Sequence, residues 1–556
     1  MNTKEIMSPW QRLVGLLKLE RRDLLQVIYY AIFSGILALT LPLGIQAIIN
    51  LIQGAQVSTS WIVLVVLVTL GVAFVGILQL MQMRIIETIQ QRIFTRASFE
   101  FTYRFPKIKM NEIRNHYPPE LANRFFDTLN IQKGLAKILV DIPAAVLQII
   151  FALILLSFYH PFFIAFGFLL LLLIYVVFKF TAQKGMDTSL LESKHKYKVA
   201  HWIQEVARTV ISFKLSGKTS LAINKNDDLV EDYLKARESH FRILVIQFVQ
   251  MIGFKVIVTA GLLLIGGLLV LNQEMNIGQF VAAEIIILLV IASVEKLILG
   301  LESFYDVLTS IEKIGQIVDK DIESQHGDKP IFDEGMEIEL DNVSYEVPDR
   351  EKPILENISL KINKKSRILV SGESGSGKST LFRIILGINQ PTSGNVYVNN
   401  TSLNHIMTNY YRSHLGMSLS QESTFEGTIK ENLTFGNSTI SDEKIHHVLD
   451  KVGLTTFIRD QPKGLRTVIN AEGNELSFTV AKKLILARAI IKEPKVLILE
   501  DPLDRFNQVE MKSIINYLTD KSRPWALIVV STSKNWKEKC NEHILLDKGR
   551  ASIKNV

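Results

Sequence analysis

Six long apolar stretches dominate the first 305 residues. Charged residues concentrate between these stretches, which cover about 24–53, 61–86, 137–158, 161–180, 243–272 and 278–305. A bilayer's hydrocarbon core is about 30 Å thick, and a helix needs roughly 20 apolar residues to cross it. The pattern therefore predicts an all-α membrane domain over 24–318, with six transmembrane helices and long cytosolic loops.

The loops between the apolar stretches differ in their basic residues. The loops at 54–60, 159–161 and 273–277 contain no Lys or Arg, whereas 87–136 and 181–242 are rich in both. Basic loops stay on the cytosolic side of a membrane. We therefore expect a multi-pass protein of the cytoplasmic (inner) membrane with both termini in the cytosol.

The segment 1–23, ahead of the first apolar stretch, has its own pattern. Ser8 and Pro9 suit an N-cap and a first helical position, and Trp10, Leu13 and Leu17 follow at helical spacing. This predicts a short amphipathic helix at the cytosolic interface of the membrane. A pattern this short also fits ordinary packing.

Three ionisable residues fall inside the predicted spans. At about 1.5 Å per residue, Lys255 and Glu295 lie roughly 25 Å from the outer loop and Glu284 only about 10 Å. Lys255 and Glu295 are therefore expected to pair. Glu284 has no obvious partner, which makes it a candidate for lining a translocation cavity.

The second half of the chain changes character. A polar stretch at 319–335 predicts a linker, and 336–556 alternates short apolar runs with helical patterns. This alternation is typical of a cytosolic α/β domain.

A glycine-rich loop is the first candidate functional motif of this domain. It follows a predicted strand at 366–370, precedes a helix at 381–386, and consists of Gly372, Glu373, Ser374, Gly375, Ser376, Gly377, Lys378, Ser379 and Thr380. Strand, G-x-x-x-x-G-K-S and helix in this order form a phosphate loop, in which backbone N–H groups converge on phosphate oxygens. Lys378 would reach the terminal phosphates and Ser379 would ligate magnesium. ATP and magnesium are thus the expected cofactors of a P-loop nucleotide-binding domain.

Two acids follow a buried strand downstream. Glu500 and Asp501 come directly after Val496–Leu499, and in phosphoryl transfer one such acid holds magnesium while the other polarises the attacking water. With these motifs the chain resembles the ATP-binding cassette (ABC) transporters of the exporter class, in which six spans precede the ATPase domain. The resemblance implies an ABC ATP-binding domain over 336–556 and an ATPase or translocase activity.

Further segments support the resemblance and carry its implications. Gln421 matches the family's glutamine loop, 472–477 the approach to the family signature, and 545–550 its closing strand. The resemblance makes Gln421 a catalytic residue and a magnesium ligand beside Ser379 and Glu500. It also implies a second half-transporter as partner, in a homodimer or heterodimer, and coupling segments near Pro118–Lys133 and Tyr197–Lys218.

Five departures from the family pattern concern hydrolysis and nucleotide contacts. The signature Leu-Ser-Gly-Gly-Gln here reads Leu476 to Val480 with bulky side chains, the acids Glu500 and Asp501 are in inverted order, and the segment after them is three residues shorter. Thr532 stands at the switch-histidine position. Val347 replaces the adenine-stacking aromatic, for which Tyr345 is a candidate substitute. We therefore expect MgATP binding with slow or absent hydrolysis.

Composition limits the alternatives. The net charge is +7 and 48% of residues are hydrophobic, but the basic residues lie in the loops between spans, so a nucleic-acid partner is not expected and membrane lipid is. One interpretation is an exporter subunit with weakened hydrolysis; the alternative is a catalytically impaired regulatory or structural subunit of a transport complex. A predicted turn at Leu41–Gly44 and the segment Asn123–Phe126 loosely resemble bacterial type I secretion exporters, whose partners include a periplasmic adaptor. The transported substrate stays open.

Overall fold

The computed structural model describes residues 7–53, 59–114, 116–348, 350–473 and 475–555, without the side chains of 176–178, 180, 472, 554 and 555. The chain divides into two compact units. Unit 1 comprises Met1–Lys107 and Asn115–Lys320, and unit 2 comprises Ile108–Arg114 and Asp321–Val556. Most of the predicted outer loop at 54–60 lies outside the described residues.

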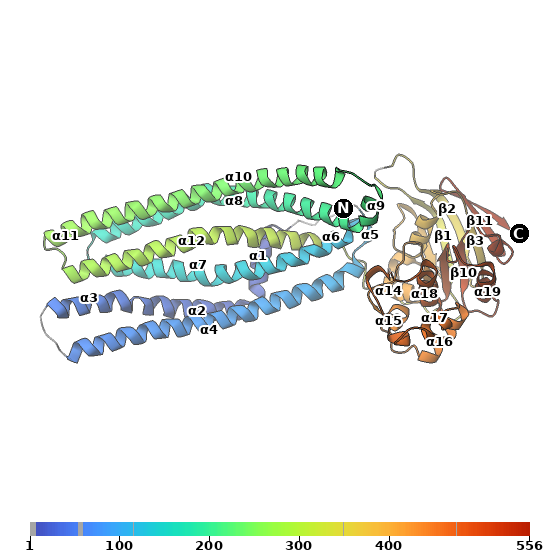
Figure 1. Cartoon of the computed structure of the whole chain (residues 1–556), viewed down its shortest axis with the longest axis horizontal. Helices are drawn as coiled ribbons and strands as arrows, with labels where there is room; N and C mark the ends of the chain where they lie inside the picture. The colour runs from blue at the N-terminus through green and yellow to red at the C-terminus, as the bar shows by residue number, and fades with distance from the viewer. Residues whose placement is uncertain (1–6, 54–58, 115, 349, 474, 556) are drawn as a thin grey trace. The chain divides into compact units, whose positions relative to one another are not determined.

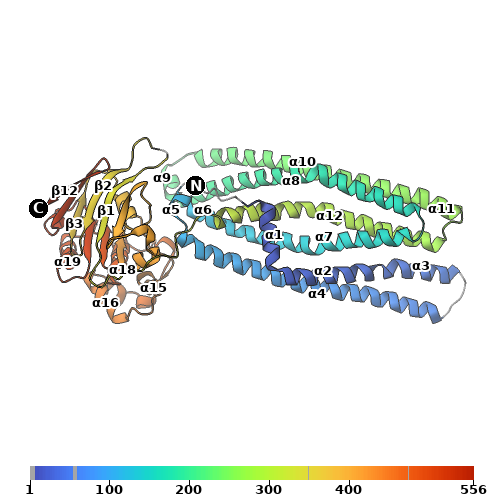
Figure 2. The ribbon, with the colours of Figure 1, turned by 180° about the vertical axis from the view of Figure 1, so that it is seen from behind.

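Unit 1 is a bundle of long helices that run side by side (Figure 1, Figure 2). Its elements are α1 Pro9–Leu19, α2 Arg21–Ala38, α3 Thr40–Gln53, α4 Thr59–Arg104, α6 Pro118–Asn123, α7 Asp127–Ser157, α8 Phe162–Arg208, α9 Val210–Leu215, α10 Leu221–Gly261, α11 Gly267–Leu271 and α12 Ile277–Val318, with short helical turns at Phe105–Lys107, Arg124–Phe126 and Leu262–Gly266. Along their lengths α7 packs on α12, α8 on α10 and α2 on α4. The all-α prediction is confirmed.

Five of the predicted spans lie within these helices to within one residue at each end, while 24–53 is divided between α2 and α3 at Leu39. Five helical stretches of the described chain are long and apolar enough to cross a membrane, and α8 adds a shorter apolar start at Phe162–Tyr175. Several helices continue well beyond the roughly 30 Å that a bilayer core requires. Buried aliphatic and aromatic side chains such as Phe254, Ile287 and Val290 form the core between α7, α8, α10 and α12.

The predicted turn at Leu41–Gly44 is wrong, because these residues belong to helix α3. The helix is interrupted earlier, at Leu39, and Pro42 lies in the first turn of α3, where the N–H that proline lacks needs no helical acceptor. Gly44 is required for close packing instead, since a Cβ there would collide with Val68 of α4.

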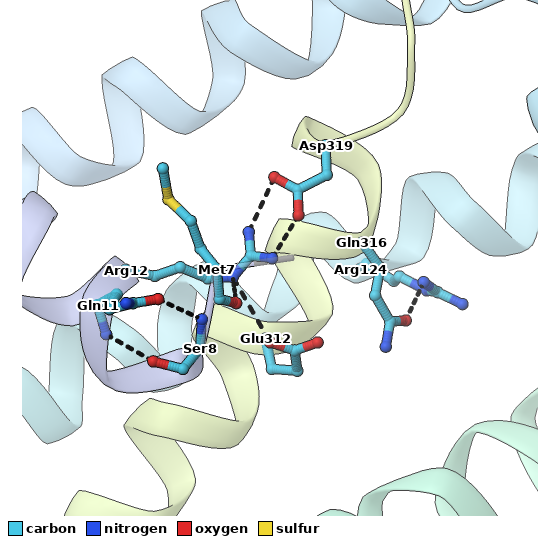
Figure 3. A network of polar contacts seen from close by, with 8 residues as sticks. All are labelled: Met7, Ser8, Gln11, Arg12, Arg124, Glu312, Gln316 and Asp319. Carbon is cyan, nitrogen blue, oxygen red and sulfur yellow. Dashed lines mark hydrogen bonds and ion pairs between the residues drawn. The ribbon is translucent and has the colours of Figure 1, made fainter. Parts of the chain in front are cut away.

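Helix α1 is tied to the C-terminal end of α12 (Figure 3). Ser8 and Gln11 form the capping box that starts the helix, as Ser8-Pro9 predicted. Arg12 donates hydrogen bonds to both carboxylate oxygens of Asp319, one at 3.0 Å, and its Nε lies 3.5 Å from Glu312. Gly315 leaves the space for this guanidinium, because a Cβ at that position would meet it.

Unit 2 contains two larger sheets, one two-stranded sheet and surrounding helices. The parallel sheet has the order β12-β11-β3-β10-β9-β6, with only β12 antiparallel, and the antiparallel sheet has the order β2-β1-β4-β5. The strands are β1 Ile338–Tyr345, β2 Leu355–Ile362, β3 Arg367–Ser371, β4 Ser393–Val398, β5 Thr401–Ser402, β6 Leu415–Ser418, β7 Gly427–Thr428, β8 Val468–Ile469, β9 Val496–Glu500, β10 Ala526–Val530, β11 Glu542–Asp547 and β12 Arg550–Asn555. The helices are α5 Met110–Ile113, α13 Lys378–Ile385, α14 Thr408–Ser413, α15 Ile429–Thr434, α16 Asp442–Lys451, α17 Thr455–Arg459, α18 Phe478–Ile490, α19 Gln508–Thr519 and α20 Lys534–Lys537.

The short segment Ile108–Arg114 groups with unit 2, although it lies in sequence between two membrane helices. Ile108 forms a β-bridge with Ile322, and the Lys109 N–H donates to the Asp321 carbonyl at 3.0 Å. Hydropathy alone does not predict this pairing across more than two hundred residues.

Candidate nucleotide-binding site

Four neighbouring parallel strands end at the same edge of the sheet. The phosphate loop follows β3, Thr532 lies two residues after β10, Glu500 ends β9, and Gln421 lies three residues after β6. Ligands of open α/β sheets bind at the carboxyl ends of parallel strands. The topology thus brings together four segments that the sequence assigned to one nucleotide site.

The phosphate loop takes a backbone conformation that favours glycine at three positions. Gly372, Gly375 and Gly377 have φ of 152°, 83° and 104°, and a Cβ on Gly377 would lie 2.8 Å from Leu355 and 2.9 Å from the Ile354 carbonyl. Lys378 begins helix α13, and its ammonium donates to the carbonyls of Gly372 at 2.9 Å and Glu373 at 2.6 Å. The Lys378 ammonium is therefore folded over the loop, and the oxygens of a bound phosphate would replace these carbonyls as its hydrogen-bond acceptors.

Glu500 forms the centre of the predicted magnesium position. The hydroxyl of Ser379 donates to one carboxylate oxygen, while the N–H and hydroxyl of Ser420 donate to the other at 3.0 and 2.9 Å. Burial alone would raise the pKa of Glu500, but these hydrogen bonds outweigh burial and lower it. The carboxylate therefore stays ionised beside Ser379, as a magnesium ligand requires.

Asp501 lacks the hydrogen bonds that hold the neighbouring carboxylate of Glu500. Its side chain is exposed and has no hydrogen-bond partner among the described residues, and its backbone is left-handed with φ 42°. Desolvation, together with the carboxylates of Glu500 and Asp504, raises the pKa of Asp501. The acid that would polarise water is thus unsupported in a strained position.

Gln421 and Thr532 lie on the rim of the site. The Gln421 carboxamide oxygen accepts a hydrogen bond from Arg383, and Thr532 is exposed just after β10. Sequence reasoning did not single out Arg383 or Ser420. Ser420 directly precedes Gln421, so its neighbourhood was a usable signal; Arg383 offered none beyond its place in the helix after the loop.

Tyr345 points to another part of unit 2. It lines a cavity of about 430 Å³ with Ile384 and Ile388, at the C-terminal end of α13, and no phosphate-loop residue lines that cavity. Val347, at the adenine-stacking position, is 5% exposed. Among the described residues, neither Tyr345 nor Val347 is therefore seen to form an aromatic platform beside the phosphate loop.

The signature segment forms a helix start. Ser477 caps α18 by accepting from the Val480 N–H at 3.3 Å, and Phe478 stands 43% exposed as the first helical residue. Residue 474 of the predicted approach lies outside the described residues. The predicted closing strand at 545–550 is a hairpin instead, since Lys548 and Gly549, both with positive φ, turn the chain from β11 to β12.

The ionisable residues predicted inside the membrane spans lie on α10 and α12. Lys255 on α10 donates to Glu295 on α12 at 2.6 Å, which confirms the predicted pair. Glu284 is half-buried and has no polar partner among the described residues.

The donors present fit magnesium and a nucleotide triphosphate. One carboxylate, one adjacent hydroxyl and a glycine-rich amide loop are the protein's share of such a site, because magnesium takes its remaining ligands from phosphate and water. In the described chain no three His, Cys, Asp or Glu residues form a metal cluster, and a phosphate-bridged magnesium does not need one.

A polytopic helical unit and a P-loop α/β unit in one chain define a membrane protein with a nucleotide-binding domain. Two family models match the chain: the ABC transporter transmembrane region over residues 24–294 and the ABC transporter domain over 355–504. Together they cover most of the sequence. The chain belongs to the ABC transporter family, with its membrane region and ATP-binding region fused.

Named relatives are exporters and permeases. A putative export ATP-binding/permease protein of Rickettsia bellii is 26% identical over 68% of this chain and 66% of its own length. ATP-dependent permease MDL1 of Candida albicans is 30% identical over 50% of this chain and 42% of its own. The alpha-hemolysin translocation ATP-binding protein HlyB of Escherichia coli O157:H7 is 26% identical over 54% and 43%. The alignments therefore span between about two fifths and two thirds of these relatives.

The fold has a solved counterpart. A bacterial Atm1-family ABC exporter with ATP bound superposes with a TM-score of 0.85 at 16% identity, covering 96% of this chain and 94% of the exporter. This likeness establishes the exporter fold for the chain.

Proposed function

We propose that this chain is one subunit of an ABC exporter of the cytoplasmic membrane, with both termini cytosolic, and that it binds MgATP but hydrolyses it slowly. A second half-transporter, identical or different, completes the machine. The exporter names of the relatives and the fold support the class.

The contrast between two adjacent acids carries the part on hydrolysis. Glu500 is held by Ser379 and Ser420, whereas Asp501 has no supporting hydrogen bond among the described residues. When bound, magnesium would neutralise charge on the phosphates. The chain's own residues would hold the triphosphate through Lys378 and the loop amides, but water would be oriented poorly by an unsupported Asp501, where a misplacement of roughly 1 Å costs about a hundredfold in rate.

A comparison of three variants of the full chain in lipid nanodiscs tests this function. Binding of a fluorescent ATP analogue and steady-state phosphate release are measured for the natural chain, Lys378→Ala and Asp501→Asn. Lys378→Ala should weaken binding at least about tenfold, and Asp501→Asn should leave both binding and the slow turnover within about twofold. Rapid turnover that depends on Asp501 would contradict slow hydrolysis, and a natural chain that does not bind ATP would contradict the proposal as a whole.

The exposed Phe478 in the signature favours a second candidate, a regulatory subunit in which ATP binding controls association without transport. Side chains there oppose the close approach that glycines permit. Reconstituted vesicles distinguish the candidates, because nucleotide-dependent association without movement of any candidate substrate would support the regulatory subunit.

A further inference from the structure

The cavity of about 430 Å³ that Tyr345 lines is separate from the nucleotide site. None of the described residues of the phosphate loop lines it, and neither does Glu500. Apolar side chains form part of its lining, among them Ile384, Ile388 and Leu403. Ligand pockets in proteins usually have volumes of about 300–1,000 Å³ and combine an apolar lining with a few polar groups. The cavity therefore has the size and the lining of a site for a small organic molecule.

One wall of the cavity comes from a distant part of the sequence. Asn111 and Arg114 line it from the segment Ile108–Arg114, which belongs to unit 2 like the rest of the lining. The Lys109 ammonium of this segment forms an ion pair with Asp321 at 3.7 Å. The wall is thus attached to the unit that contains the other lining residues.

Two opposite charges line this cavity without neutralising each other. The side chains of Arg114 and Glu346 are exposed, and neither forms a hydrogen bond or an ion pair within the part of the chain that the structure describes. By contrast, Glu323 accepts two hydrogen bonds from Arg412, at 2.7 and 2.9 Å, and Lys109 has its ion pair. The remaining guanidinium and carboxylate suit a ligand that carries one negative and one positive group.

Four side-chain amides add hydrogen-bonding capacity to the lining. They belong to Asn111, Asn389, Gln390 and Asn404, and none of them has a hydrogen-bond partner among the described residues. A carboxamide can donate and accept at the same time, and a peptide unit offers one N–H and one C=O in return. Unpaired carboxamides beside apolar side chains therefore complement a ligand with amide groups and an apolar body.

We propose that this cavity binds a short zwitterionic peptide with apolar side chains. Arg114 binds the carboxylate of the peptide and Glu346 binds its ammonium, through charge-assisted hydrogen bonds. The carboxamides bind the peptide bonds, and the apolar side chains pack on Ile384 and Leu403. A sugar or an uncharged nucleoside would use the amides but would leave both charges unpaired.

A peptide in this cavity contacts two segments that are far apart in the sequence. Asn111 and Arg114 follow helix α4 in the chain, whereas Ile384 belongs to α13, the helix that begins with Lys378 of the phosphate loop. Binding stabilises the local structure of both segments, which slows their amide hydrogen exchange. The inference goes beyond the proposed function, since it requires neither ATP hydrolysis nor transport.

The first arm of the test measures which end groups of a peptide are recognised. Binding of leucyl-leucine to the full chain in lipid nanodiscs is measured by calorimetry, beside its N-acetylated form and its C-terminal amide. Each capped form should bind at least about tenfold more weakly than the free dipeptide. Equal binding of all three forms would overturn the inference, and so would the absence of leucyl-leucine binding.

Variants of the two charged residues assign each end of the peptide. Arg114→Gln should remove the preference for a free carboxylate and keep the preference for a free ammonium, and Glu346→Gln should do the reverse. Arg459→Gln and Glu443→Gln are the matched controls, because both residues are exposed in unit 2 and do not line the cavity. They should change neither preference. Variants of Arg114 and Glu346 that kept both preferences would overturn the inference.

The second arm locates the bound peptide. Ile388→Trp places a larger side chain in the cavity and should abolish leucyl-leucine binding, while binding of fluorescent ATP stays within about twofold, which shows that the variant folds. Lys378→Ala should do the opposite, because Lys378 does not line the cavity.

Hydrogen exchange of the natural chain completes this arm. Leucyl-leucine should slow exchange over residues 108–114 and 384–391, and should not do so in Ile388→Trp. Peptide binding that survives Ile388→Trp, or that leaves exchange unchanged in both segments, would place the peptide elsewhere in the molecule and overturn the inference.

Discussion

Two glycines of the phosphate loop allow the cost of backbone strain to be distinguished from the cost of a steric clash. Gly375 and Gly377 both have positive φ, at 83° and 104°, but a Cβ on Gly375 would meet open space, whereas one on Gly377 would press on Ile354 and Leu355. Both alanine variants cost about 1–2 kcal/mol of backbone strain. We expect Gly377→Ala to weaken ATP binding at least about tenfold more than Gly375→Ala; equal losses would show that strain alone decides.

The adjacent acids should respond to pH in opposite directions. The raised pKa of Asp501 arises first from desolvation and then from Glu500 and Asp504, so at neutral pH the folded state contains a carboxylate that it disfavours. This penalty fades as the pH falls through the raised pKa and is gone below the unfolded value of about 3.9. The lowered pKa of Glu500 instead gives stability that is present at neutral pH and lost on acidification.

Asp501→Asn should therefore increase the free energy of unfolding of unit 2 at pH 7, and the gain should shrink as the pH approaches 4. Urea unfolding of the detergent-solubilised chain at several pH values measures it. Asp460→Asn serves as the control, because Asp460 is exposed and far in sequence from the acid pair. A gain that did not vary with pH would exclude carboxylate crowding as its cause.

At the scale of elements, one guanidinium forms the ion pairs between α1 and α12, which also pack together through Leu13 and Trp10. Arg12 contacts Asp319 and Glu312, and its side chain is only 9% exposed. Arg12→Ala should loosen α1, seen as faster amide hydrogen exchange over residues 9–19, while Lys18→Ala, which removes an exposed charge of the same helix, should not.

Gly315→Ala tests the same tie from the other side. The added Cβ occupies the place of the guanidinium, so this variant should speed exchange in α1 as Arg12→Ala does. The double variant should be little worse than either single one, because both remove one interaction. Additive effects would mean that Gly315 stabilises α12 independently of Arg12.

The ion pair between α10 and α12 gives a second prediction at this scale. Lys255→Met or Glu295→Met alone leaves one charge without its partner among membrane helices, which we expect to cost about 1–3 kcal/mol. The double variant should recover most of the loss. Thermal unfolding in detergent measures all three, and a double variant as unstable as the single ones would show that the pair itself is favourable.

An element could be predicted from the sequence only where the residues that specify it lie close together in the chain. The phosphate loop and Glu500 each follow a buried strand, so a short window of sequence was sufficient to place them. The Arg12–Asp319 contact joins residues 307 positions apart, and the β-bridge between Ile108 and Ile322 joins residues more than two hundred positions apart. The prediction of a turn at Leu41–Gly44 was wrong because proline and glycine are common in turns. Proline also fits the first turn of a helix, and glycine also fits a close contact between two helices.

For the whole molecule, two compact units with separate hydrophobic clusters imply two separate unfolding events. The clusters of unit 1 lie between the long helices and those of unit 2 around the sheets, so calorimetry of the full chain in detergent should show two transitions. A ligand that binds one native unit stabilises that unit by about 2.7 kcal/mol at a hundredfold excess over Kd. MgATP should therefore raise only the unit 2 transition, and Lys378→Ala should abolish the shift. A shift of both transitions together would instead mean that the two units unfold cooperatively, so that nucleotide binding energy reaches the membrane helices even without hydrolysis.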